Sequence, residues 1–156
     1  MAHGENIRSY RDLKAWQAGM EMAEMVYGLS QLLPRQEIHG LTSQIQRAAV
    51  SVPSNIAEGH ARDSTKEFLR FVSIALGSLA ELETQFLLIA RLHYLDENDM
   101  GATMLKIDET GKLARGLQKS LKRKISSTHN PQPPAPSPQP LAPNLQPLAP
   151  SSGDSI

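Results

Sequence analysis

Apolar side chains recur every three or four residues in four consecutive segments between Asp12 and Ile125. This spacing places them on one side of an α-helix, whereas a half-buried strand would alternate apolar and polar residues. Strand-like alternation occurs nowhere in the sequence. The pattern therefore predicts an all-α protein, and four amphipathic helices of this length favour a four-helix bundle.

The first helix is expected from Asp12 to Leu33. Asp12 is a typical N-cap, because its carboxylate can accept hydrogen bonds from the free amides of the first turn. Pro34 ends the helix, since the residue before a proline is disfavoured in the helical conformation. The apolar face that we expect in the core consists of Leu13, Trp16, Met20, Ala23 and Tyr27.

The second helix is expected at 37–61. Pro53 lies inside it and is expected to kink it, because proline lacks an amide hydrogen and its ring clashes with the preceding turn. Its apolar stripe consists of Leu41, Ile45, Ala48, Ala49, Val52 and Ile56.

The third helix, at 64–95, carries two apolar stripes. Ser64 can cap its first turn, and Glu67 can complete a capping box. The main stripe consists of Phe68, Val72, Ala75, Leu79, Leu82, Phe86 and Ile89. The second, about a quarter turn away, consists of Leu69, Leu76, Ala80 and Leu87. A helix in an isolated bundle needs only one such face, so the second stripe predicts contact with another copy of the chain.

The fourth helix follows the turn at 96–99 and is expected to reach Ile125. One side carries Leu113, Leu117, Leu121 and Ile125. The other side carries the basic residues Lys112, Arg115, Lys119, Lys122 and Arg123, with Lys124 nearby, and all six form the predicted nucleic-acid-binding site. No acidic residue follows Glu109 in this helix. Solubility requires only mixed charge, so a run of one sign indicates an acidic partner such as RNA.

The composition changes at Ser126, beyond which Lys, Arg and Glu are absent and proline is frequent. Three similar pentapeptides, Gln132–Pro136, Gln139–Pro143 and Gln146–Pro150, recur at a seven-residue spacing. Such sequence favours polyproline II conformation and buries too little apolar surface to form a core. One interpretation is that the tail binds as a ligand in an aromatic-lined groove. The other, which we favour, is that it is a low-complexity extension under little constraint. We expect a flexible N-terminus at 1–11, a four-helix bundle domain at 12–125 and a disordered Pro-rich tail at 126–156.

The composition also bears on the cellular setting. Cysteine is absent, which excludes disulfides and thiolate zinc sites. The N-terminus has no apolar segment of the kind found in secretory signals, and no run approaches the roughly 20 apolar residues of a membrane span. We therefore expect a cytoplasmic protein that does not associate with membranes. The formal net charge of +0 conceals the basic run of the fourth helix.

The sequence GLTSQIQRAAVSVPSNIAEG at 40–59, followed by Lys66–Phe68 and Ala75–Thr84, closely resembles the bacterial 23S rRNA intervening-sequence protein family. Asp12–Gln17 is similar to the first-helix signature of that family. The resemblance implies an antiparallel up-and-down four-helix bundle that assembles as a ring-shaped homopentamer. The family is named for a genomic location, and similar bundles also serve as accessory subunits of diversity-generating reverse transcriptases.

A second group of polar residues surrounds Pro53: Arg47, Ser51, Ser54, Asn55, Glu58 and Glu81. An arginine with two carboxylates can bind a phosphate–metal complex, which is the basis of an enzyme hypothesis. We favour a structural polar network of Arg47, Ser54, Asn55, Glu58 and Glu81, which would satisfy groups that proline leaves unpaired.

Other chemistry receives little support from the sequence. The histidines lack the helical carboxylate and histidine spacing of a metal site, and no Gly-rich phosphate loop occurs, so we expect neither metal nor cofactor. Gly77 is expected to permit a close helix approach. Trp16 could stack on a base, but its place on an apolar face favours the core.

The sequence thus predicts a non-enzymatic, oligomeric bundle that presents a basic surface to RNA or another acidic partner. The alternative is a protein-binding adaptor or assembly subunit, for example for a reverse transcriptase. A third hypothesis is an enzyme with its site at Arg47, Glu58 and Glu81.

Overall fold

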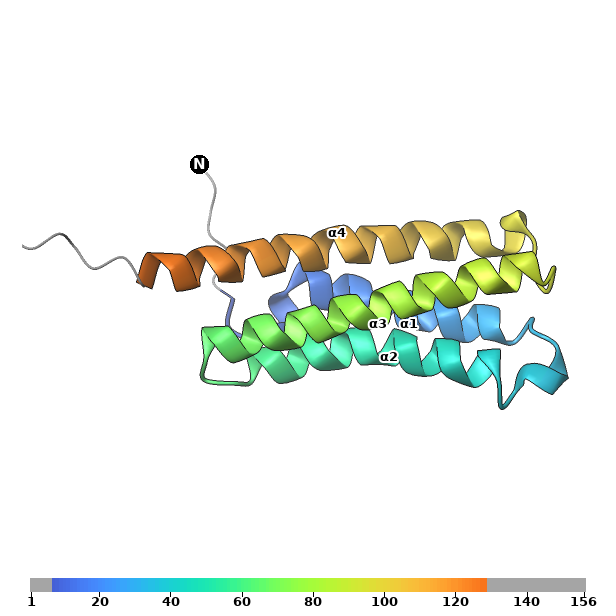
Figure 1. Cartoon of the computed structure of the whole chain (residues 1–156), viewed down its shortest axis with the longest axis horizontal. Coiled ribbons are helices and arrows are strands. Elements are labelled where there is room, and N and C mark those ends of the chain that lie inside the picture. Colours follow the sequence, from blue (N-terminus) through green and yellow to red (C-terminus); the bar gives the residue numbers. More distant parts are fainter. Residues whose placement is uncertain (1–6, 129–156) are drawn as a thin grey trace, which may run out of the picture.

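The computed structural model describes residues 7–128 of the 156-residue chain (Figure 1). Its long helices are α1 (Lys14–Ser30), α2 (Leu41–His60), α3 (Thr65–Arg91) and α4 (Glu97–Thr128). Two short 3-10 helices, η1 (Tyr10–Asp12) and η2 (Arg35–Glu37), precede α1 and α2. The part of the chain that the structure describes contains no strand, which confirms the all-α prediction. The predictions for the Pro-rich tail beyond Thr128 and for residues 1–6 fall outside the described residues.

Consecutive helices run antiparallel and are joined by short connections (Figure 1). Each helix packs against two others: α1 against α2 and α4, and α3 against α2 and α4. This is the up-and-down four-helix bundle that the sequence predicted. α4 reaches Thr128, three residues beyond the expected end at Ile125.

The core consists of the inward faces of all four helices. The α2 stripe enters it as predicted, with Ile45, Val52 and Ile56 fully buried and Leu41 half-buried. On α3, the main stripe is buried from Val72 to Ile89, and only Phe68 is half-buried. Burying a large aliphatic side chain contributes about 1.5–3 kcal/mol, so these two helices supply much of the stability.

The predicted core face of α1 is confirmed only in part. Leu13 and Ala23 are buried and Trp16 is half-buried against the core, but Met20 and Tyr27 are 39% and 45% exposed. Besides Ala23, the helix buries the following residues: Ala15, Ala18, Gly19, Met22, Val26, Leu29 and Ser30. Small residues let α1 lie close to α2, as shown by Gly19, whose Cβ position would lie 3.4 Å from Pro53 Cβ. Met22, Val26 and Leu29 recur on this face at helical spacing, so it also buries large apolar side chains.

The predicted cap of α1 is also wrong. Asp12 belongs to η1, where its Oδ2 accepts hydrogen bonds from the amides of Arg8 and Ser9, each at 2.9 Å. These two backbone hydrogen bonds lower the pKa of the Asp12 carboxyl from its usual value. The N-cap position of α1 is Leu13, which supplies no side-chain hydrogen bond.

The ends of α3 agree in part with the prediction. Ser64 Oγ accepts a hydrogen bond from the Glu67 amide at 3.3 Å, which is one half of the expected capping box. The helix ends at Arg91 rather than at Leu95, because His93 has a φ of 55°. In this left-handed conformation the His93 and Tyr94 amides donate to Ala90 O and Ile89 O, which closes the helix.

Polar contacts connect elements that are distant in the sequence. Lys106 of α4 bridges Glu21 of α1 and Glu109 of its own helix, both at 2.8 Å. These two hydrogen bonds, that to Glu109 first, raise the pKa of Lys106. At the other end, the Tyr94 hydroxyl donates to Glu37 Oε1 at 3.0 Å and ties the end of α3 to η2.

Gly59 rather than Gly77 permits a close approach between helices. A Cβ at Gly59 would lie 2.6 Å from Phe71 Cβ and 2.8 Å from Phe68 Cδ2, where α2 turns into α3. A Cβ at Gly77 would meet no atom within 4 Å, so the expectation for that glycine is wrong.

We therefore expect Gly59→Ala to lower the free energy of unfolding by about 1–3 kcal/mol, because the added methyl overpacks this corner. Thermal or urea unfolding measures the change. Gly116→Ala is the matched control, since it also lies within a helix but has no atom within 4 Å of the new Cβ. It should gain about 0.5–1 kcal/mol from its higher helix propensity. Similar losses for both variants would contradict this packing.

Candidate nucleic-acid interface

Five basic residues of α4 form one exposed face of the helix. At 100° per residue, all of them fall within an arc of about 100°. We call this set the basic face: Lys112, Arg115, Lys119, Lys122 and Arg123. The helix is oriented by residues on its other side, of which Thr110, Ala114 and Leu121 are buried and Leu113 and Leu117 half-buried.

Lys124 is exposed but does not belong to this face. It follows Lys119 by five residues and so lies about 140° away around the helix. Together with His60 of α2 and Leu13, it lines a hollow at the end of the bundle where α4 leaves it. The sixth basic residue of the predicted site therefore lies apart from the other five.

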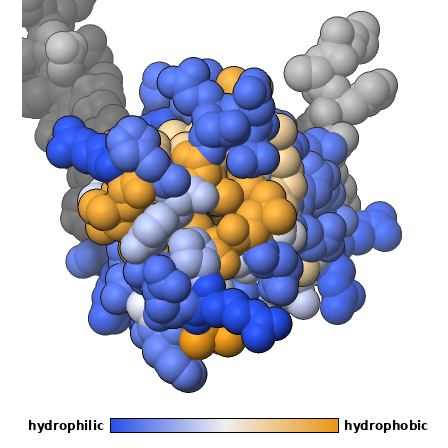
Figure 2. Space-filling view, turned by 90° about the vertical axis from the view of Figure 1, so that its right-hand side faces the viewer, coloured by the Kyte–Doolittle hydropathy of each residue, from blue (hydrophilic) through white to orange (hydrophobic). Residues whose placement is uncertain are grey.

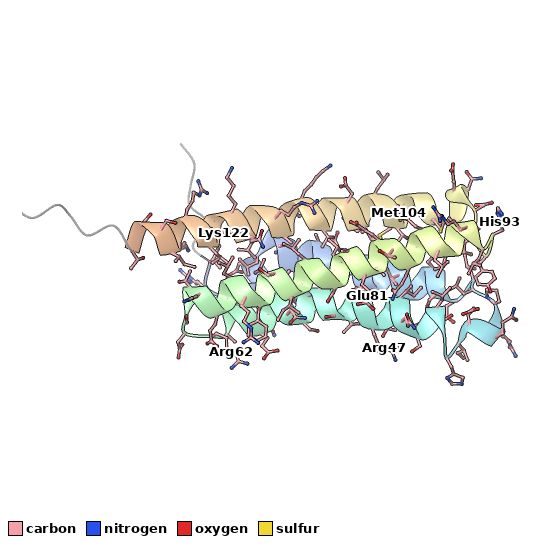
Figure 3. All side chains as sticks on the ribbon, in the orientation of Figure 1. Arg47, Arg62, Glu81, His93, Met104 and Lys122 are labelled. Carbon is pink, nitrogen blue, oxygen red and sulfur yellow. The ribbon has the colours of Figure 1, made fainter. Side chains whose placement is uncertain are left out.

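One ion pair neutralises the first residue of the basic face and leaves the charge of the other four uncompensated within residues 7–128. Lys112 Nζ lies 2.7 Å from Asp108 Oδ2, so this lysine is neutralised locally. Within residues 7–128, the other four members form no salt bridge. The uncompensated positive charge therefore extends from Arg115 to Arg123, over about 12 Å of helix. Figure 3 shows Lys122 in this part of α4, far from Arg47 on α2.

The structure does not bring the residues of the predicted polar network together. Asn55 Nδ2 donates to Ser51 O at 2.8 Å and to Ser51 Oγ at 2.9 Å. Ser51 Oγ in turn lies 2.8 Å from Ser78 Oγ, which connects α2 to α3. Ser78 was not among the predicted residues, because no local sequence pattern indicates a hydrogen-bond partner on another helix.

The other residues of the predicted polar network do not take part in the hydrogen bonds between Asn55, Ser51 and Ser78. Arg47 and Ser54 are exposed and form no side-chain hydrogen bond within residues 7–128, while Glu58 pairs with Arg62. Glu81 accepts a hydrogen bond from Gln85 Nε2 at 3.2 Å. Arg47 and Glu58 are eleven residues apart, a rise of about 16 Å, so they do not face one small substrate. The described residues also contain no group of three His, Asp or Glu side chains that could hold a metal ion.

α3 exposes an apolar surface. Of its second stripe, Leu69 and Leu76 are half-buried, whereas Ala80 and Leu87 are exposed. Among residues 7–128, α3 is the one helix long and apolar enough to span a membrane by composition, and 39% of its most apolar window is buried. Core helices of soluble proteins share this composition. The exposed side chains of Ala80 and Leu87 form apolar surface that is available to a partner.

A further apolar patch lies at the end of the bundle that carries the connections between α1 and α2 and between α3 and α4 (Figure 2). Leu32, Ile38 and Leu92 are exposed there.

Comparisons with known proteins identify the kind of bundle. The family described as 23S rRNA-intervening sequence protein matches residues 11–116. A crystal structure of a protein of unknown function from the S23 ribosomal protein family of Bacteroides thetaiotaomicron has the same fold, with a TM-score of 0.63 and 24% sequence identity. The similarity covers 67% of this chain and 95% of that one. No curated protein matches the chain.

The connection between Asn55, Ser51 and Ser78 leads to a stability prediction. Asn55→Ala should lower the free energy of unfolding by about 0.5–1.5 kcal/mol, because it removes the donor to Ser51. Urea unfolding followed by circular dichroism measures this change. The neighbouring Ser54→Ala is the control and should change stability by less than about 0.5 kcal/mol, since Ser54 is exposed. Equal losses would mean that the network extends to Ser54 after all.

Proposed function

The chain belongs to the family of 23S rRNA-intervening sequence proteins, and from this premise we propose that it is a non-enzymatic, oligomeric bundle that binds RNA through the basic face of α4. The observation that carries the proposal is the run of four exposed basic side chains from Arg115 to Arg123, none of which forms a salt bridge within residues 7–128. Phosphate contacts require such charges and no base-reading residues.

The basic residues that support RNA binding lie mostly outside the part of the chain that matches the family. The family match ends at residue 116, so Lys119, Lys122 and Arg123 lie beyond it. RNA binding is therefore inferred from these residues and their exposure, and not from the term rRNA in the family name. Basic residues near the C-terminus of a helix also interact favourably with its dipole, so the test must separate stability from binding.

Self-association would make a short basic face effective. A single face makes only a few phosphate contacts, but several copies in one assembly bind the same strand with a high effective concentration. The exposed part of the second stripe on α3 supports such an assembly, and five copies are the expectation from the family resemblance. The same surface would serve a protein partner in the adaptor alternative.

The assembly can be tested at Leu87, which is 58% exposed, so that a charge there is tolerated in a folded monomer. We expect the native chain to have a multiple of the monomer mass by light scattering, and Leu87→Asp to lower that mass with unchanged helicity. Leu105→Asp is the matched control, because Leu105 is 73% exposed on α4, outside the stripe. A native monomer, or an unchanged mass for Leu87→Asp, would remove the stripe as the interface.

RNA binding can be tested by reversing three charges of the basic face. Lys119→Glu, Lys122→Glu and Arg123→Glu together should abolish binding to a long single-stranded RNA, as measured by fluorescence anisotropy. For the native chain, the four basic side chains from Arg115 to Arg123 predict that log affinity falls with log salt at a slope of about −3 for each subunit in contact with the strand, with little sequence preference.

The control variant replaces three exposed basic residues elsewhere with Glu: Arg35, Arg47 and Lys66. None of these three forms a salt bridge within the described residues. This variant has the same net charge as the first and should retain most of the affinity. Equal losses in the two variants would indicate a general charge effect. Full affinity in the α4 variant would exclude the basic face, and absence of binding by the native chain at low salt would favour the adaptor alternative.

A further inference from the structure

Most of the α1 face that was expected in the core, namely Trp16, Met20, Ala23 and Tyr27, lines an apolar groove. The groove lies between α1 and α2 and has a volume of about 410 Å³. Three aromatic side chains line it, Tyr10 from η1 and Trp16 and Tyr27 from α1, and α2 contributes Val50 and Pro53. Tyr10 packs edge-on against Trp16 with ring centroids 5.3 Å apart, so the aromatic wall is continuous at this end.

The polar tips of the three aromatic residues are available for hydrogen bonding. Within residues 7–128, neither the Trp16 indole nitrogen nor the hydroxyls of Tyr10 and Tyr27 form a hydrogen bond, although Tyr94 does. None of them is enclosed, because the one buried side-chain polar atom without a partner in this part of the chain is Gln85 Oε1. The groove thus combines flat apolar surfaces with free donors at their edges.

These features fit one class of ligand. A polyproline II segment has no internal hydrogen bonds, so its carbonyl oxygens are free to accept from Trp and Tyr donors while its rings pack between aromatic side chains. Of the 11 prolines in the chain, all except Pro34 and Pro53 lie between Pro131 and Pro150. We propose that the groove binds the Pro-rich tail of the same chain, through the repeat Gln139–Pro143 or Gln146–Pro150. The proposal is independent of RNA binding.

The lengths of the groove and the repeat agree. Trp16 and Tyr27 are eleven residues apart on α1, a rise of about 16 Å. Five residues in polyproline II conformation span about 15–16 Å. One pentapeptide such as QPLAP at 139–143 therefore extends from one aromatic residue to the other.

The tail also starts close enough to reach the groove. Lys124 lines the same hollow as Leu13 and His60, and the His60 ring lies 6.5 Å from that of Tyr10. Thr128 lies four residues beyond Lys124 on α4, a rise of about 6 Å. To reach the groove from there, the chain must return this distance and cross α1, which has a diameter of about 10–12 Å. The ten residues 129–138 extend to about 30 Å, which suffices for Gln139, whereas the three residues before Gln132 reach only about 10 Å. The second and third repeats are thus the ones that fit.

Trp16 provides a direct reporter, because it is the one tryptophan of the chain and lies in the groove. The tail beyond Thr128 contains no Trp, Tyr or Phe, so it contributes no fluorescence of its own. We expect the full chain to emit at a shorter wavelength than a full-length variant in which every proline from 131 to 150 is serine. A synthetic peptide of residues 138–150 should restore the blue shift in that variant and saturate.

In the native chain the tethered tail competes with the added peptide. Its effective concentration is on the order of millimolar, so displacement should need at least about tenfold more peptide than binding to the serine variant does. Tyr27→Ser in the serine variant should weaken peptide binding at least about tenfold, because it removes one end of the groove. Leu105→Ser is the matched control and should leave peptide binding unchanged.

Three results would overturn the proposal. Identical Trp16 emission in the native chain and the serine variant, with no response to the peptide, would leave the groove without this ligand. A blue shift that grows with protein concentration and persists in the serine variant would assign the groove to a second copy of the bundle. Peptide binding that is insensitive to Tyr27→Ser would place the peptide elsewhere on the surface.

Discussion

The close approach of α1 to α2 is the contact on which the rest of the arrangement depends. Gly19 lies against Pro53, and Ala15 and Ala18 are buried on the same side of α1. The buried face of α1 combines these small residues with Met22, Val26 and Leu29, and the adjacent face with Met20 and Tyr27 remains at the surface. The core consists of these α1 side chains together with the branched and aromatic side chains of α2 and α3, which are buried on their inward faces.

This contact also explains which buried helix faces could be predicted from the sequence and which could not. The stripes of α2 and α3 were predictable, since Ile, Val, Leu and Phe recur at helical spacing on faces without competing residues. On α1, two adjacent faces competed, and apolar volume favoured the wrong one because the partner surface at Pro53 was unknown. The end of α3 was not predictable either, since His93 adopts a positive φ that sequence rules assign to Gly or Asn. Of the candidate site, the exposure of the basic residues and the separate place of Lys124 follow from helical spacing, and Asp108 and Lys112 have the i,i+4 spacing of a helical ion pair. The contact between Ser51 and Ser78 could not be predicted, because it depends on how α2 and α3 pack.

The proposed interactions use different parts of the bundle. The basic face belongs to α4, the exposed apolar stripe belongs to α3, and the aromatic groove lies between α1 and α2. Each therefore has substitutions that leave the other surfaces intact. Loss of assembly should weaken RNA binding because the multivalent contacts are lost, whereas tail binding can fail without affecting either. Covering the groove with the chain's own tail would also remove an exposed apolar surface that otherwise favours nonspecific association.

The packing of α1 can be measured directly by nuclear Overhauser contacts in the full chain. The structure predicts strong contacts between the α-protons of Gly19 and the ring protons of Pro53, because a Cβ on Gly19 would lie only 3.4 Å from Pro53 Cβ. It also predicts that the Met22 methyl group is inaccessible to a soluble paramagnetic probe, because Met22 is fully buried. Absence of the Gly19 contacts, together with an accessible Met22 methyl group, would show that a different face of α1 enters the core and would contradict this account.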